Sequence, residues 1–216
     1  LHWPDRPINL FGGGLSYKHY DLESVAIEET LKVLGDLVKE GKIRYVGLSN
    51  ETPWGLSEFI KAAEMHDLPK VVSVQNAYNL LNRIYESGMS EFHHRSQVGL
   101  LAYSPLAQGY LTGKYLDGAR PAGARTTLFE RGQRYETEQA EEIIRKYVNL
   151  ANEYSMDPAL MANSFVNDQD FVTSNIIGAT TMEQLKIAVG SIDTKLDEEC
   201  LKKIEEIHYG CPNPCP

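Results

Sequence analysis

The sequence lacks any long apolar segment. None of its 216 residues belong to a run approaching the roughly 18 apolar residues that a membrane-spanning helix needs. It also lacks a charged stretch followed by a short apolar run near its start, the pattern of a secretory signal. We therefore expect no membrane span and a cytoplasmic location. An organelle stays open because the chain opens on Leu1, within LHWP, which reads as a strand end and suggests a start part-way through a domain.

Basic residues are in deficit. The chain has 21 Lys and Arg against 30 Asp and Glu, for a net charge of −9 and a pI near 5.2. A surface of this sign repels a phosphate backbone, so we expect no nucleic-acid partner. Any site for an anionic ligand must be built locally, from backbone N–H groups and a few cationic side chains.

Cysteine is scarce too. The three cysteines are Cys200, Cys211 and Cys215, and the last two lie in CPNPCP at the C-terminus. A metal site would need further His or Cys ligands close by, and only His208 is near enough in sequence. We therefore expect reduced thiols and no metal, as in a reducing compartment.

The chain also lacks a G-x-G-x-x-G fingerprint, low-complexity segments and any composition break that would divide it. The missing fingerprint argues against an open dinucleotide-binding sheet. The FGGGL run at 11–15 follows a loop and opens no helix, so we interpret it as a flexible linker. We treat residues 1–216 as part of a single domain.

Hydrophobic periodicity predicts alternating helices and short strands. The expected helices span 23–40 (with Gly41 as its C-terminal cap), 52–67, 84–96, 137–154, 157–168, 181–189 and 196–208. The expected strands span 43–50, 71–78, 98–105 and 174–180, with LHWP as the end of a further one. Residues 106–136 are expected to be irregular. The strands are apolar through their middles, which indicates a parallel α/β sheet buried on both faces beneath outer helices.

Each expected strand ends on small polar or aromatic residues. In chain order the strand ends carry His2, Ser49-Asn50, Gln75-Asn76, Tyr103-Ser104 and Gly178-Ala179-Thr180. In a closed β/α barrel these ends converge on one mouth, where such folds keep their chemistry. Thr180-Thr181 also begins a helix, whose free N–H groups and positive dipole end favour a phosphate.

Five ordered motifs resemble those of the aldo-keto reductase superfamily. They are LHWPDRP, GKIRYVGLSN, VQNAYNLLNR, LLAYSPLAQGYLTGKY and IIGATTMEQL, which together cover residue 1 to about 209. The pattern most resembles the Tas-like branch, which is related to the potassium-channel β subunits. The resemblance implies a (β/α)8 barrel of TIM type, of which this chain holds the C-terminal two-thirds. It also implies NADP(H) as cofactor and reduction of aldehydes or ketones by hydride transfer.

The resemblance assigns roles to individual residues. His2 would orient the substrate carbonyl, and Tyr103 would stack on the nicotinamide ring. The nicotinamide carboxamide is assigned to Ser49, Asn50 and Gln75. The pyrophosphate is assigned to the segment containing Ser104, Leu106, Gln108 and Lys114, with Arg125 as a further phosphate contact. The adenosine 2′-phosphate and ribose are assigned to the turn containing Gly178, Thr180, Thr181 and Gln184.

The sequence departs from the family in two places and leaves two further functions open. Family members carry Glu-Asn against adenine where this chain has Ile187 and Ala188, and residues 164–172 are more acidic than usual. The catalytic tyrosine, with its lysine and aspartate, would lie in an N-terminal part of the barrel that this sequence does not contain. The alternatives to an enzyme acting on a small carbonyl compound are a nucleotide-sensing regulatory subunit of channel-β type and an inactive truncated product.

Overall fold

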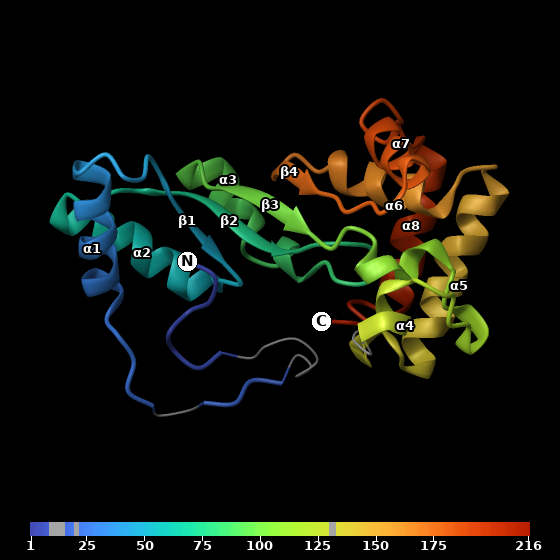
Figure 1. Cartoon of the computed structure of the whole chain (residues 1–216), viewed down its shortest axis with the longest axis horizontal. Coiled ribbons are helices and arrows are strands. Elements are labelled where there is room, and N and C mark those ends of the chain that lie inside the picture. The colour runs from blue at the N-terminus through green and yellow to red at the C-terminus, as the bar shows by residue number, and fades with distance from the viewer. Residues whose placement is uncertain (9–15, 20–21, 130–132) are drawn as a thin grey trace.

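The computed structural model describes residues 1–8, 16–19, 22–129 and 133–216, and it shows a parallel sheet flanked by helices (Figure 1). The expected linker at 11–15 lies outside the described residues. The strands are β1 (Val46–Ser49), β2 (Val71–Ala77), β3 (Gly99–Tyr103) and β4 (Val172–Ile176). They lie in the order β1-β2-β3-β4, and every neighbouring pair is parallel. The predicted parallel α/β sheet is confirmed.

The helices follow the expected order along the chain. The α-helices are α1 (Ile27–Lys39), α2 (Pro53–His66), α3 (Ser90–Ser96), α4 (Arg125–Phe129), α5 (Glu138–Glu153), α6 (Pro158–Asn167), α7 (Met182–Gly190) and α8 (Glu198–Gly210). The short 3-10 helices are η1 (Ile84–Glu86), η2 (Ala107–Thr112), η3 (Leu116–Gly118) and η4 (Gln133–Tyr135). Figure 1 shows α1 and α2 on the β1 side of the sheet and α5 to α8 grouped on the other side. None of the described helices is both long and apolar enough to span a bilayer.

Local capping explains most of the helix starts. Side-chain oxygens of Thr52, Thr137, Asp157 and Asp197 accept hydrogen bonds from backbone N–H groups in the first turns of α2, α5, α6 and α8. Pro occupies the first position of α2 and α6, where no intrahelical donor is needed. Gly41 has a φ of 71° just beyond α1, and its N–H bonds to the carbonyl of Val38 at 3.0 Å. The expected cap is confirmed.

Several expected element boundaries were wrong. Residues 1–4 form no strand, so His2 does not lie at a strand end. The N–H of Leu1 reaches Gly47 O at 2.8 Å, but Pro4 and Pro7 have no N–H with which to continue a ladder. At the other edge β4 stops at Ile176, because that residue faces Tyr103, the last residue of β3. Residues 177–180 therefore form a turn and do not extend the strand.

The helices also differ from expectation in three places. The helix expected at 84–96 divides into η1 and α3 around Gly88, whose φ of 127° breaks the helical path. The first helix begins at Ile27 and not at 23, since Ala26 has extended backbone angles and the N–H of Val25 bonds to Asp5. The segment 106–136 contains four short helices, η2, η3, α4 and η4, where we expected irregular chain.

Burial on both faces was predicted for every strand; it is wrong for β2, where Val72 keeps 42% of its surface, and more so for β4. Thr173 and Ser174 are exposed, and Ile176 keeps 37% of its surface. The strand lies at one edge of the described sheet and packs on β3 and α6. On the covered side, Asn175 donates to Asn163 at 3.2 Å and to Asn167 at 2.9 Å, which ties the strand to α6.

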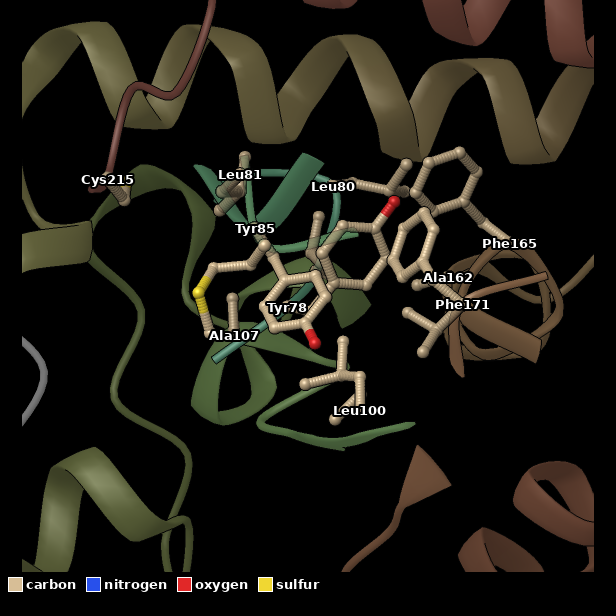
Figure 2. Close-up of a cluster of buried hydrophobic side chains, with 14 of the residues drawn as sticks. Tyr78, Leu80, Leu81, Tyr85, Leu100, Ala107, Ala162, Phe165, Phe171 and Cys215 are labelled. Carbon is tan, nitrogen blue, oxygen red and sulfur yellow. The ribbon is translucent and has the colours of Figure 1, made fainter. Parts of the chain in front are cut away.

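An aromatic cluster supports the carboxyl ends of β2 and β3 (Figure 2). Tyr78, just after β2, stacks on Phe165 of α6 with ring centroids 6.1 Å apart and meets Phe171 edge-on at 5.3 Å. Leu100 and Cys215 are buried in the same cluster, and the N–H of Cys215 donates to the carbonyl of Leu81 at 3.2 Å. The C-terminal tail is therefore fixed against the segment that follows β2.

Candidate functional site

Hydrogen bonds join the polar residues that follow β1, β2 and β3. The phenol of Tyr103 donates to Asn50 Oδ1 at 2.7 Å, and Asn50 Nδ2 donates to the carbonyl of His2 at 2.9 Å. Ser49 Oγ donates to the carbonyl of Gln75 at 2.8 Å, and the N–H of Asn50 donates to the same oxygen at 3.0 Å. Five of the predicted residues thus lie together at the carboxyl end of the sheet.

The sheet register explains why these residues meet. Ser49 faces Gln75 across β1 and β2, and Tyr103 faces Ala77 across β2 and β3. Directly after β1 and β3, Asn50 and Ser104 both have a φ of 56°, in the left-handed region that non-glycine residues seldom enter. The chain therefore turns away abruptly after each of these two strands.

Tyr103 is held in a defined orientation. It is half-buried, and burial raises the pKa of its phenol well above the usual range. The hydroxyl therefore stays protonated at physiological pH and keeps donating to Asn50. That bond in turn sets which way the Asn50 carboxamide faces, so the Tyr103 ring and the Asn50 side chain form one rigid unit.

The segment after β3 wraps tightly around Gly109. Gln108 and Gly109 have positive φ values of 58° and 97° inside η2. A Cβ on Gly109 would lie 2.9 Å from both Cε and Nζ of Lys114, so the lysine packs directly over this glycine. Asn79 donates to the carbonyl of Ser104 at 3.0 Å, which connects this segment to the chain after β2.

One polar side-chain atom in this segment makes no hydrogen bond. The Oε1 atom of Gln108 is buried and has no hydrogen-bond partner. A buried amide oxygen without a donor is costly unless a ligand supplies one. Leu106 is half-buried just before it and packs against the main core. Ser104, Leu106, Gln108 and Lys114 therefore share one compact loop.

The turn from β4 into α7 begins with a reciprocal cap. Thr181 Oγ1 accepts from the N–H of Gln184 at 3.2 Å, and Gln184 Oε1 accepts from the N–H of Thr180 at 2.9 Å. The expected helix start at Thr180-Thr181 is confirmed, with Thr181 as the N-cap. Gly178 lies in the same turn, and a Cβ placed there would meet open space.

A cavity of about 340 Å³ opens at this turn. Its walls are Ile177, Ala179, Thr180, Thr181, Met182 and Leu185. No described lysine or arginine lines it, so its polar character comes from hydroxyls and the N-terminus of α7. Arg125 is exposed on α4, and Figure 1 shows α4 well apart from α7. The structure therefore does not bring Arg125 to this turn.

The sequence analysis missed one charged pair beside the site. Glu51 directly follows Ser49-Asn50, and its carboxylate pairs with Arg6 from the LHWPDRP motif. Arg6 lies in a motif quoted above and Glu51 directly follows another, but 45 positions separate them and no local spacing rule joins them. The one available signal was an acidic residue just before a Thr-Pro helix start. An acidic residue at this place is explained by its favourable interaction with the helix dipole, so it does not identify an ion-pair partner.

No metal centre is formed by the part of the chain that the structure describes. There, no group of three or more His, Cys, Asp or Glu side chains is placed to hold a metal ion. Cys200, Cys211 and Cys215 are free thiols, of which Cys200 and Cys215 are buried. Burial raises the pKa of Cys215 to about 12, which disfavours its thiolate.

Comparison with known proteins agrees with the fold and the motifs. Residues 1–208 match the profile of the aldo/keto reductase family. The whole chain is 47% identical over 217 residues to Protein tas of Escherichia coli strain K12, of which it covers 62%. It is 38% identical over 229 residues to an aldo-keto reductase of Babesia bovis, covering 99% of this chain and 80% of that protein.

A relative with a more specific name is also similar. L-glyceraldehyde 3-phosphate reductase of Escherichia coli strain K12 is 34% identical over 185 residues, covering 82% of this chain and 52% of that protein. The chain therefore spans 62% of the Tas protein and about half of this reductase. It belongs to the aldo/keto reductase family, and its parallel strands and helices form part of that family's (β/α) barrel.

Proposed function

We propose that the intact protein is an NADP(H)-dependent oxidoreductase that reduces aldehydes or ketones to alcohols. The observation that carries the proposal is the hydrogen-bonded set at the carboxyl ends of β1 to β3, formed by His2, Ser49, Asn50, Gln75 and Tyr103. These residues belong to a chain of the aldo/keto reductase family. The bound nicotinamide supplies the hydride that the carbonyl carbon accepts, and the protein supplies position and electrostatics.

The residues of the proposed site offer groups to the nicotinamide and to the pyrophosphate of the cofactor. At the nicotinamide end, Ser49, Asn50 and Gln75 offer hydroxyl and amide groups to a carboxamide, and the Tyr103 ring offers an apolar face. At the pyrophosphate, Lys114 adds a cation, which packs over Gly109. His2 would orient the substrate carbonyl. Ile187 and Ala188 offer no polar side chain to adenine, so affinity there rests on the Thr180-Thr181 turn.

Replacing Gln75 by Ala should lower turnover and weaken cofactor binding without unfolding the protein. The side chain lies two residues before the end of β2 and is half-buried, while the backbone carbonyl that Ser49 and Asn50 use stays in place. Loss of the amide would misorient the nicotinamide ring, and misplacement by about 1 Å can cost roughly a hundredfold in rate. Steady-state kinetics and a thermal melt of the intact protein test this. An unchanged kcat with an intact fold would contradict the assignment.

The intact protein should bind NADPH about a hundredfold more tightly than NADH. The Thr180 and Thr181 hydroxyls line a shallow cavity at the start of α7, whose N-terminus favours an anion. Two charge-assisted hydrogen bonds to a 2′-phosphate are worth on the order of 3 kcal/mol, which is about a hundredfold. Fluorescence titration gives the two Kd values, and Thr180→Val should narrow their ratio. Equal Kd values for the two cofactors would contradict the preference.

The partner that we propose for this chain is the N-terminal part of the same barrel. On α7 and just after it, the apolar residues Met182, Val189 and Ile192 are 67%, 53% and 67% exposed. The edge strand β4 is largely uncovered, and an open strand edge beside an apolar helix face favours aggregation. Further strands and helices of the barrel would cover both surfaces.

A further inference from the structure

We propose that the ion pair between Arg6 and Glu51 is a positioning device that holds His2 at the carboxyl end of the sheet. The inference rests on the proposed function, because it concerns how His2 reaches the place where a substrate carbonyl would lie. It assigns a role to two residues that lie beside the proposed site without belonging to it. Neither side chain is proposed to touch substrate or cofactor.

Residues 1–8 need such a device because no ladder fixes them. They form no strand, and two prolines interrupt their donors. Beyond Leu1, the segment is attached by side chains: Asn50 donates to the carbonyl of His2 at 2.9 Å, and Asp5 accepts from the N–H of Val25 at 2.5 Å. Arg6 adds an ion pair with Glu51. These contacts therefore help to fix the position of His2.

The Arg6 guanidinium is held by several groups at once. It donates to both carboxylate oxygens of Glu51, and its Nη2 also donates to Thr52 Oγ1 at 2.8 Å. The central carbon of the guanidinium, Cζ, lies 4.9 Å from the ring centroid of Trp54, in a cation–π contact. A planar fork with paired donors fixes orientation as well as distance, which a lysine ammonium does not.

The carboxylate is equally constrained. The side chain of Glu51 is only 2% exposed, against 18% for Arg6. Its Oε1 accepts from the N–H of Thr52 at 2.7 Å, at the start of α2, where the helix dipole favours an anion. The backbone of Glu51 exchanges two hydrogen bonds with the side chain of Asn76 on β2, at 3.0 Å and 2.8 Å. The pair thus connects residues 1–8 to the start of α2 through Thr52, and to β2 through the backbone of Glu51.

Gly55 provides the seat for the pair. A Cβ at this position would lie 2.2 Å from Arg6 Nη2 and 2.2 Å from Glu51 Oε1. Its N–H donates to Thr52 Oγ1 at 3.3 Å within the first turn of α2. Alanine is the better helix former of the two residues, so Gly55→Ala should displace the ion pair without weakening the helix. Because the substitution affects the ion pair and not the helix, it tests the role of the ion pair directly.

The experiment measures Gly55→Ala in the intact protein, with Gly210→Ala at the end of α8 as the control. A Cβ at Gly210 meets nothing within 4 Å. We expect Gly55→Ala to lower kcat for a reactive aldehyde by about 10- to 100-fold, while the Kd for NADPH matches that of the control. Glu51→Gln should lower kcat in the same direction and serves if Gly55→Ala does not fold. A kcat for both variants equal to that of the control would overturn the proposal.

A double-mutant cycle with His2→Ala separates this inference from the function on which it rests. If the pair acts through His2, the combined variant should lose no more kcat than His2→Ala alone. Additive losses would overturn the positioning role. If His2→Ala itself leaves kcat unchanged, the assigned role of His2 fails and the inference fails with it. If His2→Ala lowers kcat but Gly55→Ala and Glu51→Gln do not, the function stands and only the inference fails.

Discussion

The 216-residue chain alone should reduce no carbonyl substrate at a rate attributable to the site. It carries His2 at the proposed mouth, but the tyrosine acid expected for the family would lie in the proposed N-terminal part. A general acid is typically worth about 10²–10⁴ in rate, and loss of substrate positioning lowers the rate further. Weak cofactor binding should survive, because the proposed contacts to the nucleotide are on this chain. The expected result is therefore binding without turnover.

The assay follows NADPH oxidation with 4-nitrobenzaldehyde. The purified chain is measured alone, with a separately made N-terminal piece, and beside the intact protein. Fluorescence titration on the same samples reports NADPH binding. Turnover should return only when both parts are present. Robust turnover by the chain alone would contradict the proposal that the catalytic acid lies outside it.

Replacing Arg83 by Met should destabilise the intact protein by about 1.5–3 kcal/mol, because it removes the buried cation to which two partly exposed carboxylates are hydrogen-bonded. Arg83 is 7% exposed in the segment after β2. Its Nε and Nη2 donate to Glu86 at 2.7 Å and 2.9 Å, and its Nη1 donates to Glu205 of α8 at 2.7 Å. Tyr78 donates to the same Glu86 at 2.5 Å. The Arg83 guanidinium therefore links η1 to α8 through Glu86 and Glu205, and Glu86 also binds the buried phenol of Tyr78.

The titration of this cluster supports the same view. Burial on its own would lower the pKa of Arg83, but its hydrogen bonds to Glu86 and Glu205 more than offset this, so the pKa is raised. Burial, with the nearby Glu86 carboxylate, raises the pKa of Tyr78 far above its ordinary value. The cation is thus strongly favoured here, and removing it leaves like charges close together.

Urea unfolding of the intact protein measures the effect, with Arg95→Met as the control. Arg95 pairs with Glu91 one turn away on α3, and their side chains are 76% and 63% exposed. An exposed pair of this kind is worth at most about 0.5 kcal/mol. If Arg83→Met costs no more than Arg95→Met, the buried cluster does not hold the fold together.

Local chemistry in the sequence determined the helices and the parallel sheet. Thr52-Pro53 and Asp157-Pro158 mark the starts of α2 and α6. The side chains of Thr52 and Asp157 accept hydrogen bonds from N–H groups of the first turn, and the prolines stand where no N–H donor is needed. Gly41 similarly marks the end of α1. Apolar runs marked all four strands, although pairing set their ends, as at Ile176. The polar character of the strand ends was also visible, because it depends only on where each run stops.

Tertiary structure alone decided which residues meet. Tyr103 and Asn50 are 53 positions apart, and they bond because parallel register brings their strands to a common edge. Arg83 reaches Glu205 across 122 positions, through the packing of α8. Arg6 and Glu51 pair above Gly55, which leaves the necessary space by having no side chain. The local sequence pattern predicts where helices and strands begin and end. Contacts between distant residues depend on strand register and helix packing, which the whole chain determines.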